Sequence, residues 1–565
     1  MTKRRRFAAA VAVLVAAAVL AGCAGIPDSG PVRAGGRISQ VTEPLDLDFN
    51  PSPPAKDASQ LDLLHGFIDA ASSPRNSYSI AREFLTPRLA ATWDPDASVT
   101  VDQGTGRVYQ ETSTISWTLA VTPQAVVDSS GDYHQVTSKS PVTLAYSFQK
   151  IAGQWRISVA PDGIVLDAST FNSVFSPQDL YFYSPDYQYL VPDQRWFPAR
   201  ASTATRIVKA LLTGPSPWLQ GAVISAFPKG TQLRVGAVTT TGDQAQVDLT
   251  SDAAQAGALT LERMQLQLSQ SLGTLVSSVQ ISIEGTTQSI RALSAANMPS
   301  TTQTIDSHPL VSRGGNVGFL TGSTLSAIPG ISDKLDPLHP TSVVLSSNRQ
   351  TAAALTASGV FVARASTTDA PTKADGRPGL IAPSLDNYGY AWTVPADDPS
   401  SLTVMGVDGT SRPVKTNWPS ATQIASLAVS RDGTRLIAIL MSGDEWTVVA
   451  AGITRDSSNV PISVGQPFVL SMGSGTPIST AWIDNLEIVT LSAEPNGQTS
   501  VAQQQIGGTL NTSVGPLDGA EIAGAGGVAE YLVRTSAGSL QAPTGAGWQV
   551  QADKIDVLGT QMGTP

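Results

Sequence analysis

The sequence is poor in cysteine and in charge. Cys23 is the only cysteine among 565 residues, and only 14% of the residues are charged. A single cysteine excludes an intramolecular disulfide, which many exported proteins use to stabilise their domains. The chain also has no basic excess, because 35 basic residues stand against 45 acidic ones. This excess of acidic residues excludes two functions for the chain, which are wrapping nucleic acid and binding anionic lipid through a basic surface.

Residues for catalysis and metal binding are also scarce. The four histidines lie far apart in the sequence, at His65, His134, His308 and His339. No H-E-x-x-H, no G-x-S-x-G and no phosphate-binding glycine loop occurs, so we expect neither a metal site nor a cofactor. Two carboxylates from distant segments are enough for a glycosidase, which therefore stays open as an alternative. We predict that the protein is not an enzyme.

Only one long hydrophobic run occurs, and it lies at the N-terminus. Four basic residues, Lys3 to Arg6, precede an uncharged run of 16 residues from Phe7 to Gly22. A membrane-spanning helix needs about 20 apolar residues, so this pattern predicts an export signal over residues 1–22. The alternatives are an ordinary signal peptide with an incidental cysteine, or a short membrane anchor. Without residues 1–22 the chain has 31 basic and 45 acidic residues, a net charge of −14.

The segment around Cys23 resembles the lipobox of bacterial lipoproteins. It reads Leu20-Ala21-Gly22-Cys23, with small residues before the cysteine. The resemblance implies that the Cys23 thiol carries diacylglycerol, with acyl chains such as palmitate, and becomes the first residue of the mature chain. Two acyl chains give stable anchoring where one does not. We therefore expect a lipid-anchored protein on the extracytoplasmic face of the cell membrane. Residues 23–57, rich in Pro, Gly and small polar residues, are expected to form its tether.

Residues 58–175 are expected to form an α+β domain. "SQLDLLHGFIDAA" and "SYSIAREFLTPRLAATW" have helical patterns, and the second is interrupted at Pro87. Strand-like runs follow, ending in the hairpin "KIAGQWRI" with Gly153 in its turn. The "GQWRI…PDGI" ending resembles the last hairpin of an NTF2-like fold.

Residues 176–300 are expected to form an α/β domain that is rich in aromatic residues. Seven of the 34 aromatic residues lie within the 17 residues from Tyr181 to Phe197. One interpretation is that these rings fill the core beneath two helices. The other is an exposed face that stacks on sugar rings or anchors a protein partner. The residues assigned to that possible binding face are Tyr181, Tyr183, Tyr187, Tyr189 and Trp196.

Residues 310–565 are expected to form a β-propeller. Pairs of short apolar strands recur around polar turns near positions 347, 386, 432 and 484, roughly 40 to 50 residues apart. This period predicts five to seven blades, and an array of β-sandwiches is the alternative. Such a repeat is either a docking surface for a partner or a rigid spacer.

Several separated motifs together resemble the LpqB family of actinobacterial lipoproteins. They are the lipobox, "GFIDAA…YSIAREFLTPRLAATWDP", and "LVPDQRWFP…KALLTGPSPWLQGAVISAFPKGT", which resembles a GerMN domain, followed by the propeller-like repeats. The resemblance implies a non-enzymatic partner of the sensor histidine kinase MtrB, in the MtrA–MtrB two-component system that governs cell-wall metabolism and division. The alternative is a cell-wall lipoprotein that binds peptidoglycan glycans through the aromatic-rich domain.

Overall fold

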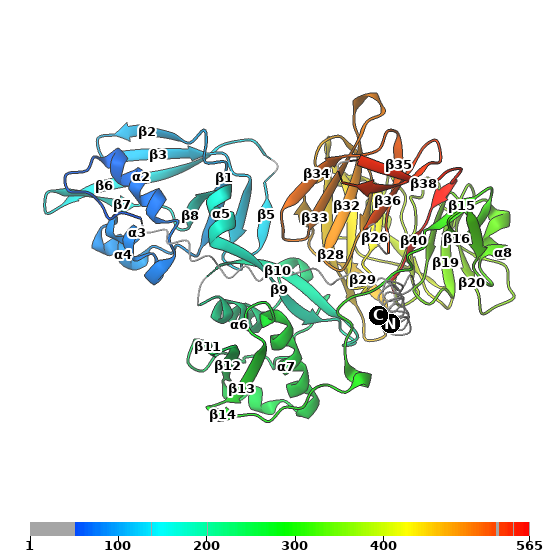
Figure 1. Ribbon diagram of the computed structural model, residues 1–565, viewed down its shortest axis with the longest axis horizontal. Helices are drawn as coiled ribbons and strands as arrows, with labels where there is room; N and C mark the ends of the chain where they lie inside the picture. The colour runs from blue at the N-terminus through cyan, green and yellow to red at the C-terminus, as the bar shows by residue number, and fades with distance from the viewer. Residues whose placement is uncertain (1–50, 137, 200–201, 527–529, 546, 564–565) are drawn as a thin grey trace, which may run out of the picture. The chain divides into compact units, whose positions relative to one another are not determined.

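The computed structural model describes residues 51–565 except 137, 200–201, 527–529, 546 and 564–565 (Figure 1). Strands dominate the described residues and form ten sheets, which confirms the prediction of a β-rich protein with several domains. In this part of the chain, no helix combines the length and the apolar composition needed to cross a membrane.

Most α-helices of the N-terminal domain begin at side-chain caps. Helix α2 (Gln60–Ala70) starts with a capping box, in which the backbone N–H of Asp62 donates to Ser59 Oγ and the Asp62 carboxylate accepts from the Ser59 N–H. The expected interruption at Pro87 separates α3 (Ser79–Glu83) from α4 (Pro87–Thr92), because proline fits the first turn of a helix and breaks its interior. The buried face of α2 packs on the sheets of this domain.

Two four-stranded sheets complete the N-terminal domain, in the orders β5-β4-β1-β8 and β2-β3-β6-β7. Their shared core makes this an α+β unit consistent with the expected NTF2-like fold. The elements are β1 (Ser98–Asp102), β2 (Val108–Ser113), β3 (Ser116–Val121), β4 (Ala125–Asp128), β5 (Tyr133–Gln135), β6 (Val142–Ile151), β7 (Gln154–Val159), β8 (Ile164–Asp167) and α5 (Ala168–Val174).

The middle domain begins with a long antiparallel hairpin of β9 (Phe175–Tyr183) and β10 (Leu190–Pro198). Helix α6 (Thr203–Thr213) ends at Gly214, whose φ of +117° suits glycine. Strands β12 and β13 are connected through helix α7 and pair with each other in parallel. They belong to a sheet of order β11-β12-β13-β14. The elements are η2 (Pro217–Leu219), β11 (Thr239–Thr241), β12 (Gln244–Leu249), η3 (Ser251–Gln255), α7 (Ala258–Leu272), β13 (Ser278–Ile283) and β14 (Thr286–Thr287).

Six sheets of four or five strands follow within the described residues from Leu310 onward, which we number as blades 1 to 6 of the propeller. In chain order the strands are β15 (Leu310–Arg313), β16 (Asn316–Thr321), β17 (Thr324–Ala327), β18 (Ser342–Leu345), β19 (Thr351–Thr356), β20 (Gly359–Arg364), β21 (Thr372–Asp375), β22 (Ser384–Leu385), β23 (Ala391–Thr393), β24 (Thr403–Met405), β25 (Ser411–Pro413), β26 (Ala421–Val429), β27 (Arg435–Ser442), β28 (Glu445–Arg455), β29 (Pro461–Val464), β30 (Phe468–Leu470), β31 (Thr476–Trp482), β32 (Glu487–Ala493), β33 (Thr499–Gln505), β34 (Leu510–Val514), β35 (Gly519–Gly524), β36 (Tyr531–Thr535), β37 (Leu540–Thr544) and β38 (Gly547–Ala552). The predicted turns near 347, 386, 432 and 484 each join the first two strands of a blade.

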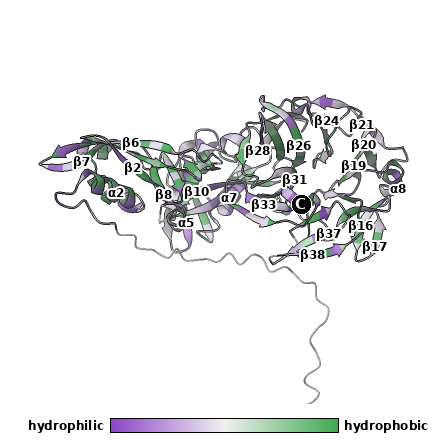
Figure 2. Cartoon of the chain, turned by 90° about the horizontal axis from the view of Figure 1, so that it is seen from above, coloured by the Kyte–Doolittle hydropathy of each residue, from purple (hydrophilic) through white to green (hydrophobic). Residues whose placement is uncertain are grey.

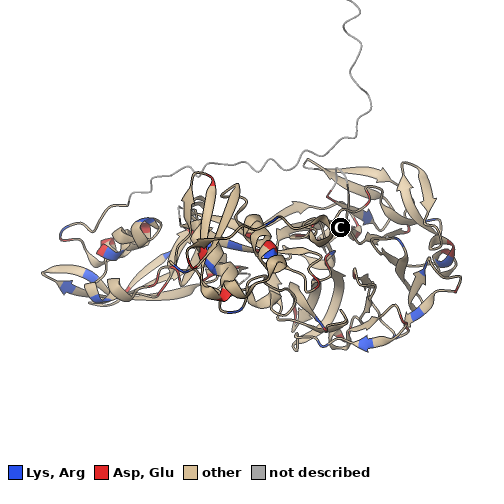
Figure 3. Cartoon of the chain, turned by 90° about the horizontal axis from the view of Figure 1, so that it is seen from below, with Lys and Arg blue, Asp and Glu red and all other residues tan. Residues whose placement is uncertain are grey.

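The C-terminal strands close the propeller on its first two blades. Strand β39 (Val557–Leu558) pairs antiparallel with β15 in blade 1, and β40 (Thr560–Gln561) pairs in parallel with β18 in blade 2. The end of the chain therefore completes sheets that began about 220 to 250 residues earlier, which leaves fewer unpaired strand edges. In Figure 2 hydrophobic residues recur along the strands between hydrophilic ones, and in Figure 3 charged residues of both signs are sparse.

Blade 4 packs closely on the middle domain. Trp218 of η2 is 5% exposed, and its ring lies 5.7 Å from the ring of Phe468 in β30. Gly452 in β28 lies next to the backbone of Trp218. A Cβ atom there would come 2.7 Å from the Ala222 Cβ and 2.8 Å from the Trp218 carbonyl oxygen.

Gly452→Ala is therefore expected to destabilise the protein by about 1–3 kcal/mol, because an added methyl group has no space at this contact. Urea denaturation followed by tryptophan fluorescence measures the effect. Gly547→Ala is the matched control, since among the described residues a Cβ atom there would meet only the Thr544 carbonyl oxygen within 4 Å, at 3.9 Å. Equal unfolding midpoints for the two variants would show that the close packing is absent.

Candidate functional site

A buried cluster of charged and polar side chains lies where the N-terminal domain meets the middle domain. Asp132 comes from the turn between β4 and β5, and Asp193 and Arg195 come from β10. Ser216 follows α6 and precedes η2. Each of these four residues is at most 3% exposed, so the chain has removed two carboxyl groups and a guanidinium from water. We call this set of four residues the junction cluster.

Hydrogen bonds and ion pairs connect its members. Arg195 Nη2 donates to Asp193 Oδ2 at 2.7 Å and to the Gly214 carbonyl at 2.8 Å. The Ser216 backbone N–H also donates to Asp193 Oδ2, at 2.9 Å. Ser216 Oγ lies 2.5 Å from Asp132 Oδ1 and 2.7 Å from Asp193 Oδ1. One serine hydroxyl therefore bridges carboxyl groups of two domains.

The environment shifts the protonation of Asp132. Burial and the neighbouring Asp193 raise the pKa of Asp132 to about 6, although Arg195 and Ser216 act in the opposite direction. The Arg195 Nε atom lies 3.9 Å from Asp132 Oδ1, beyond hydrogen-bonding distance. The junction cluster thus contains one cation facing two carboxyl groups, and one of these groups titrates close to physiological pH.

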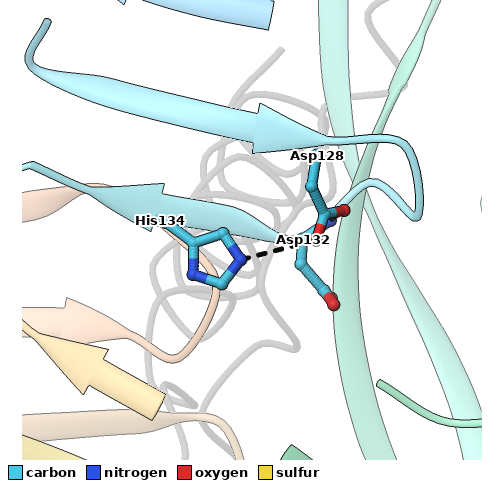
Figure 4. Close-up of side chains that lie close together, drawn as sticks. All are labelled: Asp128, Asp132 and His134. Atoms are coloured by element: carbon cyan, nitrogen blue, oxygen red, sulfur yellow. Dashed lines mark hydrogen bonds and ion pairs between the residues drawn. The ribbon is translucent and has the colours of Figure 1, made fainter. Parts of the chain in front are cut away.

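Asp128 and His134 lie beside Asp132, the member of the junction cluster that comes from the N-terminal domain (Figure 4). The His134 ring is directed toward Asp128, and its Nε2 lies 3.5 Å from Asp128 Oδ2. The hydrogen bond to Asp128 raises the pKa of His134 despite its partial burial. Burial favours a higher pKa for Asp128, but hydrogen bonds from His134 and from backbone N–H groups lower it. This pair is half-exposed, unlike the cluster behind it.

Asp128, Asp132 and His134 have the residue types of a metal site, and their ligand atoms lie within 4.8 Å of one another. The charges behind them do not suit a cation. Asp132 already faces the Arg195 guanidinium and contacts Ser216 Oγ, so a divalent ion would compete with both. We therefore assign these residues to an interdomain network and not to a metal site.

Aromatic residues next to the junction cluster in the sequence contact the propeller. The Trp196 ring lies 5.5 Å from Tyr133 and 4.9 Å from Phe171, both in the N-terminal domain. Its Nε1 donates to the Gly507 carbonyl in blade 5 at 2.8 Å. The His134 ring lies 5.0 Å from Phe468 in blade 4. Residues of all three domains are therefore in contact around Trp196 and His134.

The five aromatic residues predicted as a possible binding face lie largely in the core. Tyr183, Tyr189 and Trp196 are at most 7% exposed, and Tyr181 and Tyr187 are partly buried. Tyr183 donates its hydroxyl to the Arg263 carbonyl at 2.9 Å, and the Tyr187 ring lies 3.5 Å from the Arg263 guanidinium. The interpretation of these residues as an exposed binding face is therefore wrong, because helix α7, the propeller and the N-terminal domain contact their rings. Cys23 lies outside the described residues, and its lipidation stays a prediction.

No member of the junction cluster was predicted from the sequence. Asp193 and Arg195 stand within "LVPDQRWFP", a strand whose residues are all buried. Charged residues inside an apolar strand were a signal that could have indicated them, because buried charges need partners. Asp132 and Ser216 gave no such signal, since each lies in a polar turn.

Three of the four histidines have separate partners in the folded chain. His65 stacks on Tyr109 at 4.1 Å, His134 pairs with Asp128, and His308 pairs with Asp306 at 2.7 Å. In the portion of the protein that the structure describes, Asp128, Asp132 and His134 are the one group of three histidine, cysteine or acidic residues whose ligand atoms lie within 4.8 Å of one another.

Comparison with known protein families assigns each domain. Residues 53–172 match the model of the N-terminal domain of lipoprotein LpqB, and residues 311–557 match that of the LpqB β-propeller domain. Together these two matches cover more than half of the chain. The protein belongs to the LpqB family. Residues 179–289 match a third model, described as sporulation and spore germination, in agreement with the expected GerMN-like domain.

Relatives named lipoprotein LpqB match this chain over most of its length. The Streptomyces coelicolor protein is 26% identical over 90% of this chain and 89% of its own length. The Bifidobacterium longum protein is 27% identical over 89% and 88%, respectively. The Cutibacterium acnes protein is 34% identical over 47% of this chain and 44% of its own length. These LpqB names describe lipoproteins and state no enzymatic activity.

Proposed function

We propose that this LpqB-family protein is a non-enzymatic lipoprotein, anchored through Cys23 to the extracytoplasmic face of the cell membrane. There it binds the extracellular part of the sensor kinase MtrB and modulates MtrA–MtrB signalling in cell-wall metabolism and division. The observation that carries this proposal is the match to both LpqB domain models in the same chain. The partner follows from the resemblance of the whole chain to that family.

The arrangement of the domains supports a binding role. A chain that binds a partner benefits from surfaces held in fixed positions, since less conformational freedom is lost on association. The junction cluster and the Trp196 contacts hold the N-terminal domain, the middle domain and blade 5 together through buried groups. Binding changes the kinase output if the lipoprotein prefers one signalling state of the kinase.

The lipid anchor contributes through effective concentration. Confinement to the membrane plane where the kinase lies raises the encounter probability without any additional contact. The mature chain carries a net charge of −14, so attraction to anionic lipid does not replace the anchor.

Titration of the chain with the isolated extracellular part of MtrB tests the proposed partner. Saturable binding with one-to-one stoichiometry supports it. Absence of binding up to high micromolar concentrations, with the folded state verified by circular dichroism, would contradict it. Retention of the same chain on purified peptidoglycan would then favour the glycan-binding alternative.

Cys23→Ala is expected to release the protein from the membrane fraction, because the thiol that accepts the diacylglycerol is lost. Fractionation measures this release, and Ser29→Ala is the matched control that keeps the thiol. Binding to the isolated extracellular part of MtrB in solution should be unchanged, while MtrA–MtrB output in cells should respond as it does when the gene is deleted. A Cys23→Ala protein that stays in the membrane and signals normally would contradict the proposal.

A further inference from the structure

When both of its carboxyl groups are ionised, the junction cluster has one hydrogen atom too few for its short oxygen–oxygen contacts. Ser216 Oγ lies at hydrogen-bonding distance from two carboxyl oxygens, Asp132 Oδ1 at 2.5 Å and Asp193 Oδ1 at 2.7 Å. A serine hydroxyl has one hydrogen to donate. The second contact therefore needs a proton on one of the carboxyl groups, because two anionic or lone-pair oxygens repel each other at such distances.

The partners of Asp193 identify the group that carries this proton. Asp193 Oδ2 accepts from Arg195 Nη2 and from the Ser216 backbone N–H, and these two donors stabilise its carboxylate form. Asp132 has weaker support, since the Arg195 Nε is 3.9 Å away and, among the described residues, only Ser216 Oγ lies at hydrogen-bonding distance from its carboxyl group. The balanced arrangement is a chain in which Asp132 Oδ1–H donates to Ser216 Oγ and the Ser216 O–H donates to Asp193 Oδ1.

Charge balance gives the same result. The buried groups of the cluster then comprise one anion, Asp193, and one cation, Arg195. If Asp132 were also ionised, a second negative charge would be buried beside Asp193 without a second cation. The other titratable groups that face these residues are Asp128 and His134 on the Asp132 side and Asp179 on the Asp193 side.

We infer that Asp132 and Asp193 share one proton through Ser216, and that this proton makes the docking of the N-terminal domain on the middle domain dependent on pH. Because Asp132 belongs to the N-terminal domain and the other three residues to the middle domain, the shared proton is bound only when the two surfaces meet. When Asp132 releases its proton to water, the short contact to Ser216 loses its hydrogen and the docked arrangement is weakened.

The direction of the effect follows from the pKa of Asp132, which burial and Asp193 raise to about 6. A group whose pKa is raised by docking binds its proton more tightly in the docked state. The stabilisation of docking by this proton is fully present below the ordinary pKa of an aspartate. It is lost as the pH rises through about 6. Docking is therefore tighter in acid, and the difference between pH 5 and pH 8 is about tenfold in the docking equilibrium.

Hydrogen exchange of the full chain, purified in detergent, tests this inference. The Trp196 backbone N–H donates to the Gly131 carbonyl across the junction at 2.8 Å and so reports on docking. After correction for the intrinsic exchange rate, protection of peptides containing Trp196 should be about tenfold higher at pH 5 than at pH 8. A ratio below twofold in the unmodified protein would overturn the inference, whatever the variants do.

Two variants separate Asp132 from its neighbours. Asp132→Asn places an amide donor toward Ser216 at every pH, so the protection ratio should fall to about one while the protection itself stays high. His134→Gln removes the histidine that pairs with Asp128 beside Asp132, and the ratio should stay near its original value. A ratio that persists in Asp132→Asn, or that disappears in His134→Gln, would overturn the assignment. This test involves no kinase, so its result is independent of the proposed function.

Discussion

Replacing Arg435 with alanine is expected to lower the free energy of unfolding by about 3–5 kcal/mol. Arg435 begins β27 and forms an ion pair with Asp432, and both side chains are fully buried. The Asp432 carboxylate also accepts hydrogen bonds from the Ser430 hydroxyl and the Thr434 backbone N–H. Burial favours a higher pKa for Asp432, but Arg435 and these hydrogen bonds lower it, so the group is ionised. Without Arg435, a negative charge stays in the interior of blade 4 with no cation.

Guanidinium denaturation of the chain measures this loss. Arg412→Ala is the matched control in blade 3, because Arg412 and Asp408 form an ion pair of 3.1 Å that is largely exposed to solvent. Exposed pairs contribute about 0–1 kcal/mol, so the control should unfold close to the unmodified protein. If the two variants are equally stable, the burial assigned to the Arg435–Asp432 pair is incorrect.

Replacing Trp196 with alanine is expected to cost about 3–5 kcal/mol and to loosen contacts of all three domains. Its ring packs on Tyr133 and Phe171 of the N-terminal domain, and its indole nitrogen bonds to the Gly507 carbonyl of blade 5. The residue is 7% exposed, so truncation leaves a cavity that no single domain can close. Denaturation together with hydrogen exchange of peptides around Tyr133 and Gly507 measures both parts of this effect.

Trp196→Phe serves as the matched variant, because it keeps an aromatic ring against Tyr133 and Phe171 and removes the N–H donor. The loss of one hydrogen bond that leaves a buried carbonyl unpaired costs about 1–3 kcal/mol. Exchange around Gly507 should increase while exchange around Tyr133 changes little. Faster exchange confined to the middle domain in Trp196→Ala would contradict the role of this residue in joining the domains.

The turns of the propeller could be predicted from sequence because they are stabilised locally. Asp386, Asp432 and Asp484 each accept backbone N–H groups two to four residues further along the chain. An aspartate that satisfies a turn in this way needs no distant residue, so "SRDG" indicates a turn in any context. Gly433 follows at a φ of +71°, a conformation that favours glycine.

The aromatic cluster and the junction cluster could not be assigned in this way. Alternation in "LYFYSPDYQYLVP" indicates that Tyr181 and Tyr183 occupy opposite faces from Phe182, but gives no information on what covers either face. That depends on α7, which is about 80 residues away, and on turns of the propeller that lie about 200 residues away. Whether these rings stack on a ligand or fill a core was therefore open until the fold was known.

The sequence by itself determined the order of the domains, the strand and turn pattern of the propeller and the membership of a lipoprotein family, because each depends on neighbouring residues or on motifs in order along the chain. Only the tertiary structure decided that the predicted binding face is largely buried, and that Asp132, Asp193, Arg195 and Ser216 form one cluster. The physical reason is the range of the interactions. Hydrogen bonds within turns join residues a few positions apart, whereas burial and shared protonation depend on groups that meet only when whole domains pack.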